Sequence, residues 1–163
     1  MPLNRVLVAN RGEIAVRIIR AAQALGIETV QAVSAADRES MAADLADRCV
    51  VLGPAQSRLS YLDAKLLVHA AIQTGCDALH PGYGFLSERA ELAALCAEHD
   101  ITFVGPTAET IDALGDKLRA RAIAEDAEVA GVAGGAAGAG VAAGAAVCGV
   151  RRMDLKALRL ERL

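Results

Sequence analysis

Aromatic residues are nearly absent from this chain, which has two tyrosines, two phenylalanines and no tryptophan among 163 residues. A core must therefore be built from Leu, Val, Ile and Ala, and the hydrophobic content of 54% supplies them. So few rings give no stacking platform for single-stranded nucleic acid. The formal net charge of −3 also lacks the basic excess of a nucleic-acid-binding protein. Nucleic acid is therefore excluded as a partner.

Paired cysteine motifs are missing as well. The four cysteines show no CxxC spacing, and the three histidines lack the spacing of metal ligands. We therefore predict no metal site, and we expect buried thiols in a reducing, cytoplasmic compartment. The opening residues MPLNR run straight into an apolar strand, without the pattern of a signal peptide. The cysteines are Cys49, Cys76, Cys96 and Cys148.

Short apolar runs alternate with longer amphipathic segments five times along the first part of the chain. The runs predict strands over 5–9, 29–33, 49–52, 76–79 and 102–104. The segments between and after them predict helices over 13–25, 39–46, 60–73 and 88–99, and from Thr107 onward. Such βα repeats indicate an α/β fold with a Rossmann-like parallel sheet and helices on both faces.

Glycines and capping residues predict where the helices begin and end. Gly26 and Gly75 are natural helix stops. Residues 60–63, Ser-Tyr-Leu-Asp, resemble a capping box, and Ser87 is placed as the N-cap of the helix over 88–99. The first helix is expected to turn one apolar stripe toward the core, consisting of Ile14, Ile18, Ala21, Ala22 and Leu25.

Ligands of parallel sheets bind outside the carboxyl ends of the strands. At 80–88, HPGYGFLSE, a strand ends and Gly82 and Gly84 permit a positive φ, so the ring of Tyr83 is expected to be displayed. A glycine turn before a helix N-terminus favours anions, although a tight turn without a ligand has the same pattern. The segments predicted at this edge are 10–12, 34–38, 53–54, 81–84 and 105–106.

Three ordered blocks resemble the biotin carboxylases, the ATP-dependent part of biotin-dependent carboxylases. The blocks are HPGYGFLSE at 80–88, VANRGEIAVRI at 8–18, and Gly105-Pro106 leading to Gly-Asp-Lys at 115–117. The resemblance covers about residues 2–128. It implies that residues 1–128 form the family's N-terminal Rossmann-like domain, the pre-ATP-grasp lobe.

The resemblance also implies a reaction and a set of site residues. In the family, ATP activates bicarbonate in the presence of Mg²⁺, and the carboxyl group is passed to biotin on a carrier protein, with a carboxyltransferase as a further partner. Lys117 matches the lysine that contacts the nucleotide, and Tyr83 and Gly84 match the loop that faces biotin. Arg17 and Arg20 lie on the helix face that resembles the homodimer contact. Without the motifs, these would be solvated charges and turn residues.

The resemblance stops near residue 128, where the composition changes. Residues 129–150 are almost entirely Ala, Gly and Val, and residues 151–163 are basic and leucine-rich. A membrane helix fits the length of this tract but lacks strongly inserting residues and an aromatic belt, so a membrane is disfavoured. A linker without Ser, Pro or charge would be poorly solvated. The interpretation we favour is a low-complexity tail from a shifted reading frame.

Function depends on what lies beyond the resemblance. The family's Mg²⁺-binding glutamates, its phosphate-covering loop and its catalytic arginine would follow the matching part, so we assign no catalytic residue and expect this chain alone to be inactive. One alternative is a non-catalytic module that binds a carboxylase partner. Another is a Rossmann-type nucleotide-binding protein, which would require GxGxxG where the segment 10–15 has one glycine.

Overall fold

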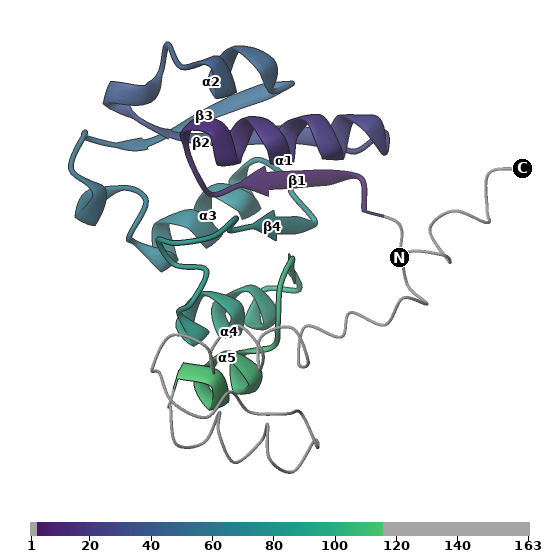
Figure 1. The fold of residues 1–163 in the computed structure, drawn as a ribbon, viewed down its shortest axis with the longest axis vertical. Helices are drawn as coiled ribbons and strands as arrows, with labels where there is room; N and C mark the ends of the chain where they lie inside the picture. Colours follow the sequence, from purple (N-terminus) through teal and green to yellow (C-terminus); the bar gives the residue numbers. More distant parts are fainter. Residues whose placement is uncertain (1–2, 116–163) are drawn as a thin grey trace, which may run out of the picture. The chain divides into compact units, whose positions relative to one another are not determined.

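The computed structural model of the protein describes residues 3–115, and within them five strands form one parallel sheet (Figure 1). The strand order is β3-β2-β1-β4-β5, which confirms the predicted Rossmann-like sheet. The strands are β1 (Arg5–Val8), β2 (Glu28–Ser34), β3 (Arg48–Gly53), β4 (Ala78–His80) and β5 (Thr102–Phe103). The α-helices are α1 (Gly12–Ala24), α2 (Met41–Leu45), α3 (Ala64–Gln73), α4 (Ala90–Glu98) and α5 (Ala108–Gly115).

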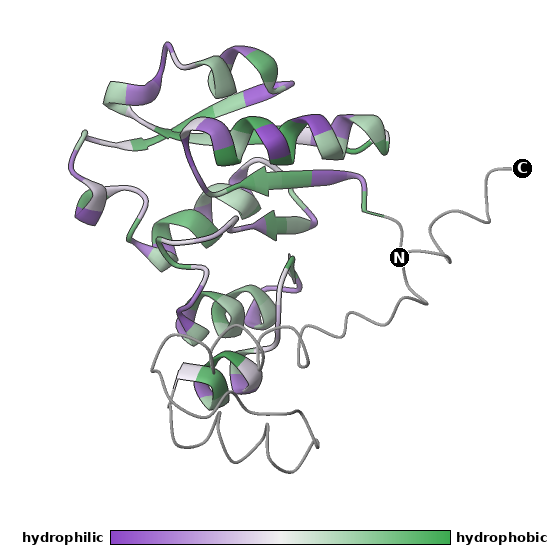
Figure 2. Cartoon of the chain, viewed as in Figure 1, coloured by the Kyte–Doolittle hydropathy of each residue, from purple (hydrophilic) through white to green (hydrophobic). Residues whose placement is uncertain are grey.

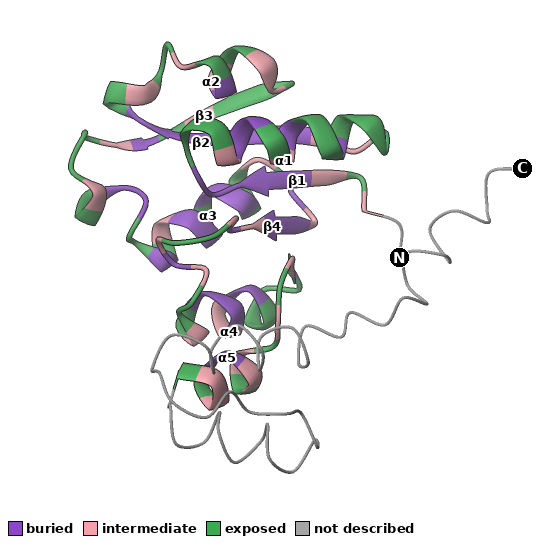
Figure 3. Cartoon of the chain, in the orientation of Figure 1, coloured by how far each residue is buried: buried purple, intermediate pink, exposed green. Residues whose placement is uncertain are grey.

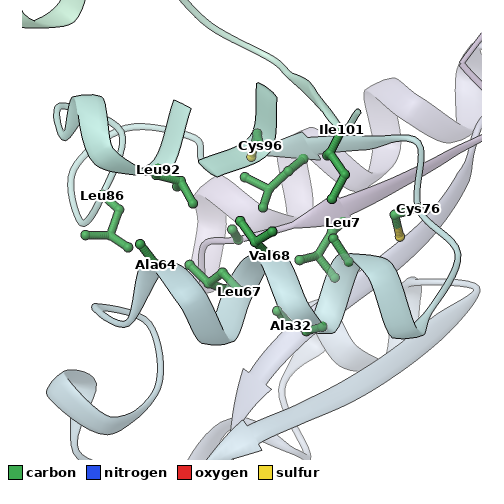
Figure 4. Packing of buried hydrophobic residues seen from close by; sticks show 14 of the residues in the cluster. Leu7, Ala32, Ala64, Leu67, Val68, Cys76, Leu86, Leu92, Cys96 and Ile101 are labelled. Atoms are coloured by element: carbon green, nitrogen blue, oxygen red, sulfur yellow. The ribbon is translucent and has the colours of Figure 1, made fainter. Parts of the chain in front are cut away.

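The central strand β1 is packed on both faces because its side chains alternate. Leu7 and Ala9 join a hydrophobic cluster with residues of α3 and α4, and Figure 4 shows Leu7 near Val68. Val8 packs on the other face, against α1 and α2. Hydrophobic residues dominate β1, whereas hydrophobic and hydrophilic residues alternate around α1 (Figure 2). Helices therefore cover both faces of the sheet, as predicted.

The buried stripe of α1 differs from the predicted one. Ala21 is exposed, and the side chain of Leu25 is 63% exposed. Leu25 is the helix C-cap, and Gly26, at φ 73°, ends the helix in a Schellman-type turn that leaves Leu25 outside the last packed turn. Figure 3 shows the buried side of α1 facing the sheet. The buried residues of α1 are Ala15, Val16, Ile19 and Ala22.

Two predicted helix starts are also wrong. Helix α3 begins after Asp63, whose carboxylate accepts a hydrogen bond from the N–H of Leu66 at 3.0 Å. Ser60 instead follows a 3₁₀ turn, and its hydroxyl donates to the Gln56 carbonyl at 2.9 Å. Helix α4 begins at Ala90 without a side-chain cap, so Ser87 lies in the preceding turn and is not the N-cap. In both places the serine belongs to a tight turn, and the helix begins later in the sequence than predicted.

The described cysteines do not all share one environment. Cys76 and Cys96 are buried, as expected, and burial raises the pKa of the Cys96 thiol to about 11. Cys49 is exposed because it lies on β3, the outermost strand of the sheet, so its predicted burial is wrong. Among residues 3–115, no helix is long and apolar enough to cross a membrane.

The sheet and helices α1 to α4 belong to one compact unit that ends at Ala108, and a second unit begins at Glu109. Helix α5 lies almost wholly in this second unit, and its buried residue is Ile111. Lys117, the predicted boundary at residue 128 and the segments 129–150 and 151–163 lie outside the described residues.

The corrected packing of α1 can be tested by comparing Ile19→Ala with Leu25→Ala. Ile19 is fully buried, so its truncation should lower the free energy of unfolding by about 2–5 kcal/mol. Leu25→Ala should change it by no more than about 0.5 kcal/mol, because the side chain already contacts water. Urea denaturation followed by circular dichroism measures both values. Equal losses in the two variants would contradict the observed orientation of the helix.

Candidate functional site

The segment after β4 is tied to the end of β1 by one buried side chain. We call residues 81–88 the glycine loop. Asn10 is fully buried, and its Nδ2 donates to the carbonyl oxygens of Pro81 at 2.7 Å and Tyr83 at 3.0 Å. Its Oδ1 accepts a hydrogen bond from the N–H of Arg11 at 2.9 Å. Both donor hydrogens of the Asn10 amide therefore hold the loop against the strand end, while its oxygen is bonded to the neighbouring backbone.

The glycines of the loop have the predicted conformation. Gly82 and Gly84 have φ values of 68° and 69°, and the side chain of Tyr83 between them is 70% exposed. A Cβ atom at Gly82 would lie 2.7 Å from Nδ2 of Asn10, whereas one at Gly84 would meet no atom within 4 Å. Gly82 thus permits close approach to Asn10, and Gly84 leaves the outer side of the loop open.

His80 supports the loop from the end of β4. Its Nδ1 accepts a hydrogen bond from the N–H of Gly82 at 3.0 Å, which places the proton of the neutral ring on Nε2. Burial lowers the pKa of His80 below its ordinary value because the charged ring would lose hydration. The neutral form is therefore the one that fits this hydrogen bond.

A second group of polar side chains, which we call the Asp37 cluster, lies at the end of β2. It consists of Arg11, Ser34, Asp37 and Tyr61. One oxygen of Asp37 pairs with the Arg11 guanidinium at 2.9 Å. The other accepts hydrogen bonds from the hydroxyls of Ser34 and Tyr61, each at 2.8 Å. The Asp37 carboxylate is thus occupied by neighbouring side chains. The dinucleotide-binding alternative would instead require a carboxylate that is presented to a ribose.

Tyr61 connects the Asp37 cluster to the glycine loop. Its ring stacks on Phe85 at a centroid distance of 5.4 Å, and the Arg11 guanidinium lies 5.9 Å from the Tyr61 ring centroid. Phe85 has a φ of 48°, which is uncommon for a bulky residue and which this packing holds in place. Burial, followed by the contact with Asp37, raises the pKa of Tyr61 to about 12.

The arrangement suits contact with a ring-shaped ligand better than metal or anion chemistry. The loop offers an exposed aromatic ring and open backbone at Gly84. The expected helix N-terminus is not adjacent, because α4 begins only at Ala90. Within residues 3–115, no three His, Cys, Asp or Glu residues come together as a metal site. This arrangement is suited to contact and orient a ligand rather than to hold a metal ion.

The structure brings some of the predicted edge segments together and leaves others apart. Contacts join 10–12, 34–37 and 81–85, as described above. Gly53 instead lies against the Leu59 carbonyl, and Gly105 donates to the Phe103 carbonyl. Arg17 and Arg20 are exposed on α1, where Arg17 pairs with Glu13 at 3.4 Å.

The parts played by Asn10, Asp37 and Tyr61 were not predicted from the sequence. Asn10 and Asp37 lay within the segments predicted at the carboxyl edge, so a polar residue directly after a buried strand was the available signal. Tyr61 had no comparable signal, because its position beside Phe85 depends on how α3 packs.

These features define a Rossmann-like α/β domain with a glycine loop at the carboxyl edge of its sheet. The sequence matches the profile of the family described as "Biotin carboxylase, N-terminal domain" over residues 2–111. The chain therefore belongs to the biotin carboxylase family, which confirms the resemblance carried by the motifs.

The chain matches only part of the length of its relatives in this family. It is 50% identical over 127 residues to biotin carboxylase 1 of Bacillus subtilis, covering 78% of this chain and 28% of that protein. It has the same identity over 127 residues to the mitochondrial methylcrotonoyl-CoA carboxylase subunit alpha of Glycine max, covering 78% of this chain and 17% of that protein. The chain thus spans less than a third of the length of these curated relatives.

A solved structure agrees with the described fold. It is the biotin carboxylase domain dimer of the Hydrogenobacter thermophilus 2-oxoglutarate carboxylase, in complex with MgADP, ADP and bicarbonate. The TM-score is 0.74 at 41% identity, with 78% of this chain and 28% of that chain covered.

The stability of the protein should fall as the pH drops from 7.5 to 5.5, because of His80. The lowered pKa in the folded state means that the unfolded chain binds more protons below about pH 6.5. The stabilisation is therefore present above that pH and is lost as the pH falls through the folded-state pKa. Urea denaturation at both pH values measures it. His80→Asn keeps an acceptor near Gly82 but does not titrate, so an undiminished pH effect in this variant would contradict the assignment.

Tyr61 should ionise at about pH 12, because burial and the Asp37 carboxylate disfavour its phenolate. The chain contains two tyrosines and no tryptophan, so Tyr83→Phe leaves Tyr61 as the only phenol. Absorbance at 295 nm during an alkaline titration of this variant should rise near pH 12, and circular dichroism should show that the fold persists below it. A transition near pH 10 in the folded variant would show that Tyr61 is not held as described.

Proposed function

We propose that this chain supplies the biotin-facing part of a biotin carboxylase, which carries out the ATP- and bicarbonate-dependent carboxylation of biotin on a carrier protein. The observation that carries the proposal is the glycine loop, with Tyr83 exposed and the space beside Gly84 open. The loop motif matches the family's biotin-facing loop, and its conformation suits a bound ring. Carrier protein and carboxyltransferase are the expected partners.

In this proposal each described side chain has a limited role. The ring of Tyr83 packs against the apolar face of biotin, and Gly84 lets the ligand approach the backbone closely. Asn10 and neutral His80 hold the loop in place. None of these residues takes part in phosphoryl transfer, so they contribute binding and orientation.

Nucleotide and metal binding belong to other parts of the site. ATP, Mg²⁺ and bicarbonate are proposed for the complete enzyme, supported by the MgADP and bicarbonate in the Hydrogenobacter thermophilus structure. Lys117 is proposed to contact the nucleotide phosphates as a point charge, and it lies outside the described residues. Among residues 3–115, no group of three His, Cys, Asp or Glu side chains fits Mg²⁺.

A homodimer through the first helix is proposed from the exposed face of α1. Arg17 and Arg20 are exposed there, and Glu13 and Arg20 border an open groove of about 440 Å³ between α1 and α2. Support comes from the Hydrogenobacter thermophilus biotin carboxylase domain, which is described as a dimer. The same surface supports the second candidate function, a non-catalytic module that binds a carboxylase partner.

The proposed biotin contact can be tested by titrating the 163-residue chain with biotin and recording ¹H–¹⁵N NMR spectra. Chemical-shift changes should concentrate at Tyr83 and Gly84. Tyr83→Ala should weaken binding at least threefold, because the packing surface is removed. Leu59→Ala, at another exposed hydrophobic residue, is the matched control and should leave the affinity unchanged. Shift changes spread over the helices, or none at all, would overturn the proposed contact.

The 163-residue chain by itself should not release phosphate from ATP in a biotin-dependent manner. The matching part of the chain covers 28% of biotin carboxylase 1 of Bacillus subtilis, and the groups that stabilise a phosphoryl-transfer transition state act as a unit. Phosphate release with bicarbonate, Mg²⁺ and biotin should match that of Lys117→Ala. Biotin-dependent turnover above this control would show that the rest of the chain supplies the missing groups.

A further inference from the structure

We infer that Asn10 is a positioning residue that fixes the glycine loop in the conformation that presents Tyr83 and Gly84 to a ligand. This inference rests on the proposed function of the loop, because the ligand tested is biotin. Asn10 itself does not touch the ligand, since its side chain is fully buried behind the loop. Its effect is on the geometry of the residues that do.

The geometry of the Asn10 amide carries the inference. One nitrogen donates to two loop carbonyls, those of Pro81 and Tyr83, which bracket Gly82. The loop therefore curls around the amide, and the missing Cβ of Gly82 is what allows the 2.7 Å approach. Because the Tyr83 carbonyl is held, the peptide unit between Tyr83 and Gly84 has a fixed orientation.

Asn10 is itself held from the next strand. Its backbone carbonyl accepts a hydrogen bond from Nε2 of Gln31 at 2.7 Å, and Gln31 is fully buried on β2. The side chain that holds the loop is thus attached to a rigid part of the sheet, with β1 between β2 and β4. The buried Asn10 amide is hydrogen-bonded through both its nitrogen and its oxygen, and buried polar groups that are paired in this way rigidify the structure around them.

The loop needs such an anchor because three of its residues adopt backbone conformations that are not regular secondary structure. Gly82, Gly84 and Phe85 all have positive φ values. Its described backbone hydrogen bonds lie further along, from Ser87 to Gly84 and from Arg89 to Leu86. Within residues 3–115, two side chains are described as hydrogen-bonded to the backbone of 81–83: Asn10 donates to two carbonyls, and His80 accepts from the N–H of Gly82. Removing the Asn10 donor would leave two loop carbonyls unpaired.

Asn10→Asp is the sharpest test in the full 163-residue chain, because it keeps the shape but points an oxygen at two carbonyl oxygens. NMR relaxation should give order parameters above about 0.8 for residues 82–85 in the parent chain and below about 0.6 in the variant. Biotin affinity should fall at least tenfold. Thr29→Val is the matched control, since it removes a part-buried side-chain hydrogen bond to Asp47 far from the loop. It should leave the order parameters and the affinity unchanged.

A glycine pair keeps the inference testable if Asn10→Asp does not fold. Gly82→Ala and Gly84→Ala impose the same left-handed strain, at φ 68° and 69°, but only the first pushes a Cβ into the Asn10 amide. Gly82→Ala should mobilise residues 83–85 much more than Gly84→Ala does. Equal mobility in the pair, or a rigid loop in folded Asn10→Asp, would overturn the inference. So would a mobile loop that binds biotin with parent affinity.

The two proposals fail in different ways. If the parent chain shows no biotin-induced shifts, the proposed biotin contact is wrong, and the order parameters alone decide whether Asn10 fixes the loop. If the parent chain binds biotin but the Asn10 and Gly82 variants bind it equally well, the inference about Asn10 is wrong and the proposed function stands.

Discussion

The burial of β1 on both faces and both edges is the constraint on which the rest of the structure depends. The strand pairs with β2 and β4, and its alternating side chains face two separate helix layers. Because all strands run parallel, this fixed centre brings the segments after β1, β2 and β4 to one edge. This convergence places Asn10, Asp37 and the glycine loop, because each follows one of these strands. Tyr61 joins them by stacking on Phe85 of the loop.

Asn10 and Ser34 are buried at this edge and Asp37 is half-buried, and burial favours pairing of such polar side chains. An unpaired amide or carboxylate in such surroundings would lose its hydration without compensation. Asn10 therefore binds loop carbonyls, and Asp37 gathers Arg11, Ser34 and Tyr61. The result is a loop held from β1 through hydrogen bonds and from the Asp37 cluster through the stacked rings of Tyr61 and Phe85. The contacts that stabilise this edge are thus the same ones that hold the loop proposed to face biotin.

The division of labour in the proposed enzyme follows from this geometry. The described residues provide an edge with an exposed ring, and within residues 3–115 no three His, Cys, Asp or Glu side chains form a group that could hold a metal ion. Orientation of one substrate is what such an edge can contribute, because positioning requires fixed contacts but no charge at the reacting atoms. The relatives that the chain matches are several times longer, which leaves room for phosphoryl transfer elsewhere in them.

The order of strands and helices, the parallel sheet, the family and the positive φ of the loop glycines could all be predicted from the sequence alone. These depend on local periodicity and on residue types that few conformations tolerate, so they can be read without knowing the neighbours. The tertiary structure decided that Asp63 rather than Ser60 caps α3, that Leu25 and Cys49 face water, and that Asn10 and Tyr61 hold the glycine loop. Those outcomes depend on which surfaces meet in space. Residues some 70 positions apart, such as Asn10 and Pro81, become partners only after the sheet has formed.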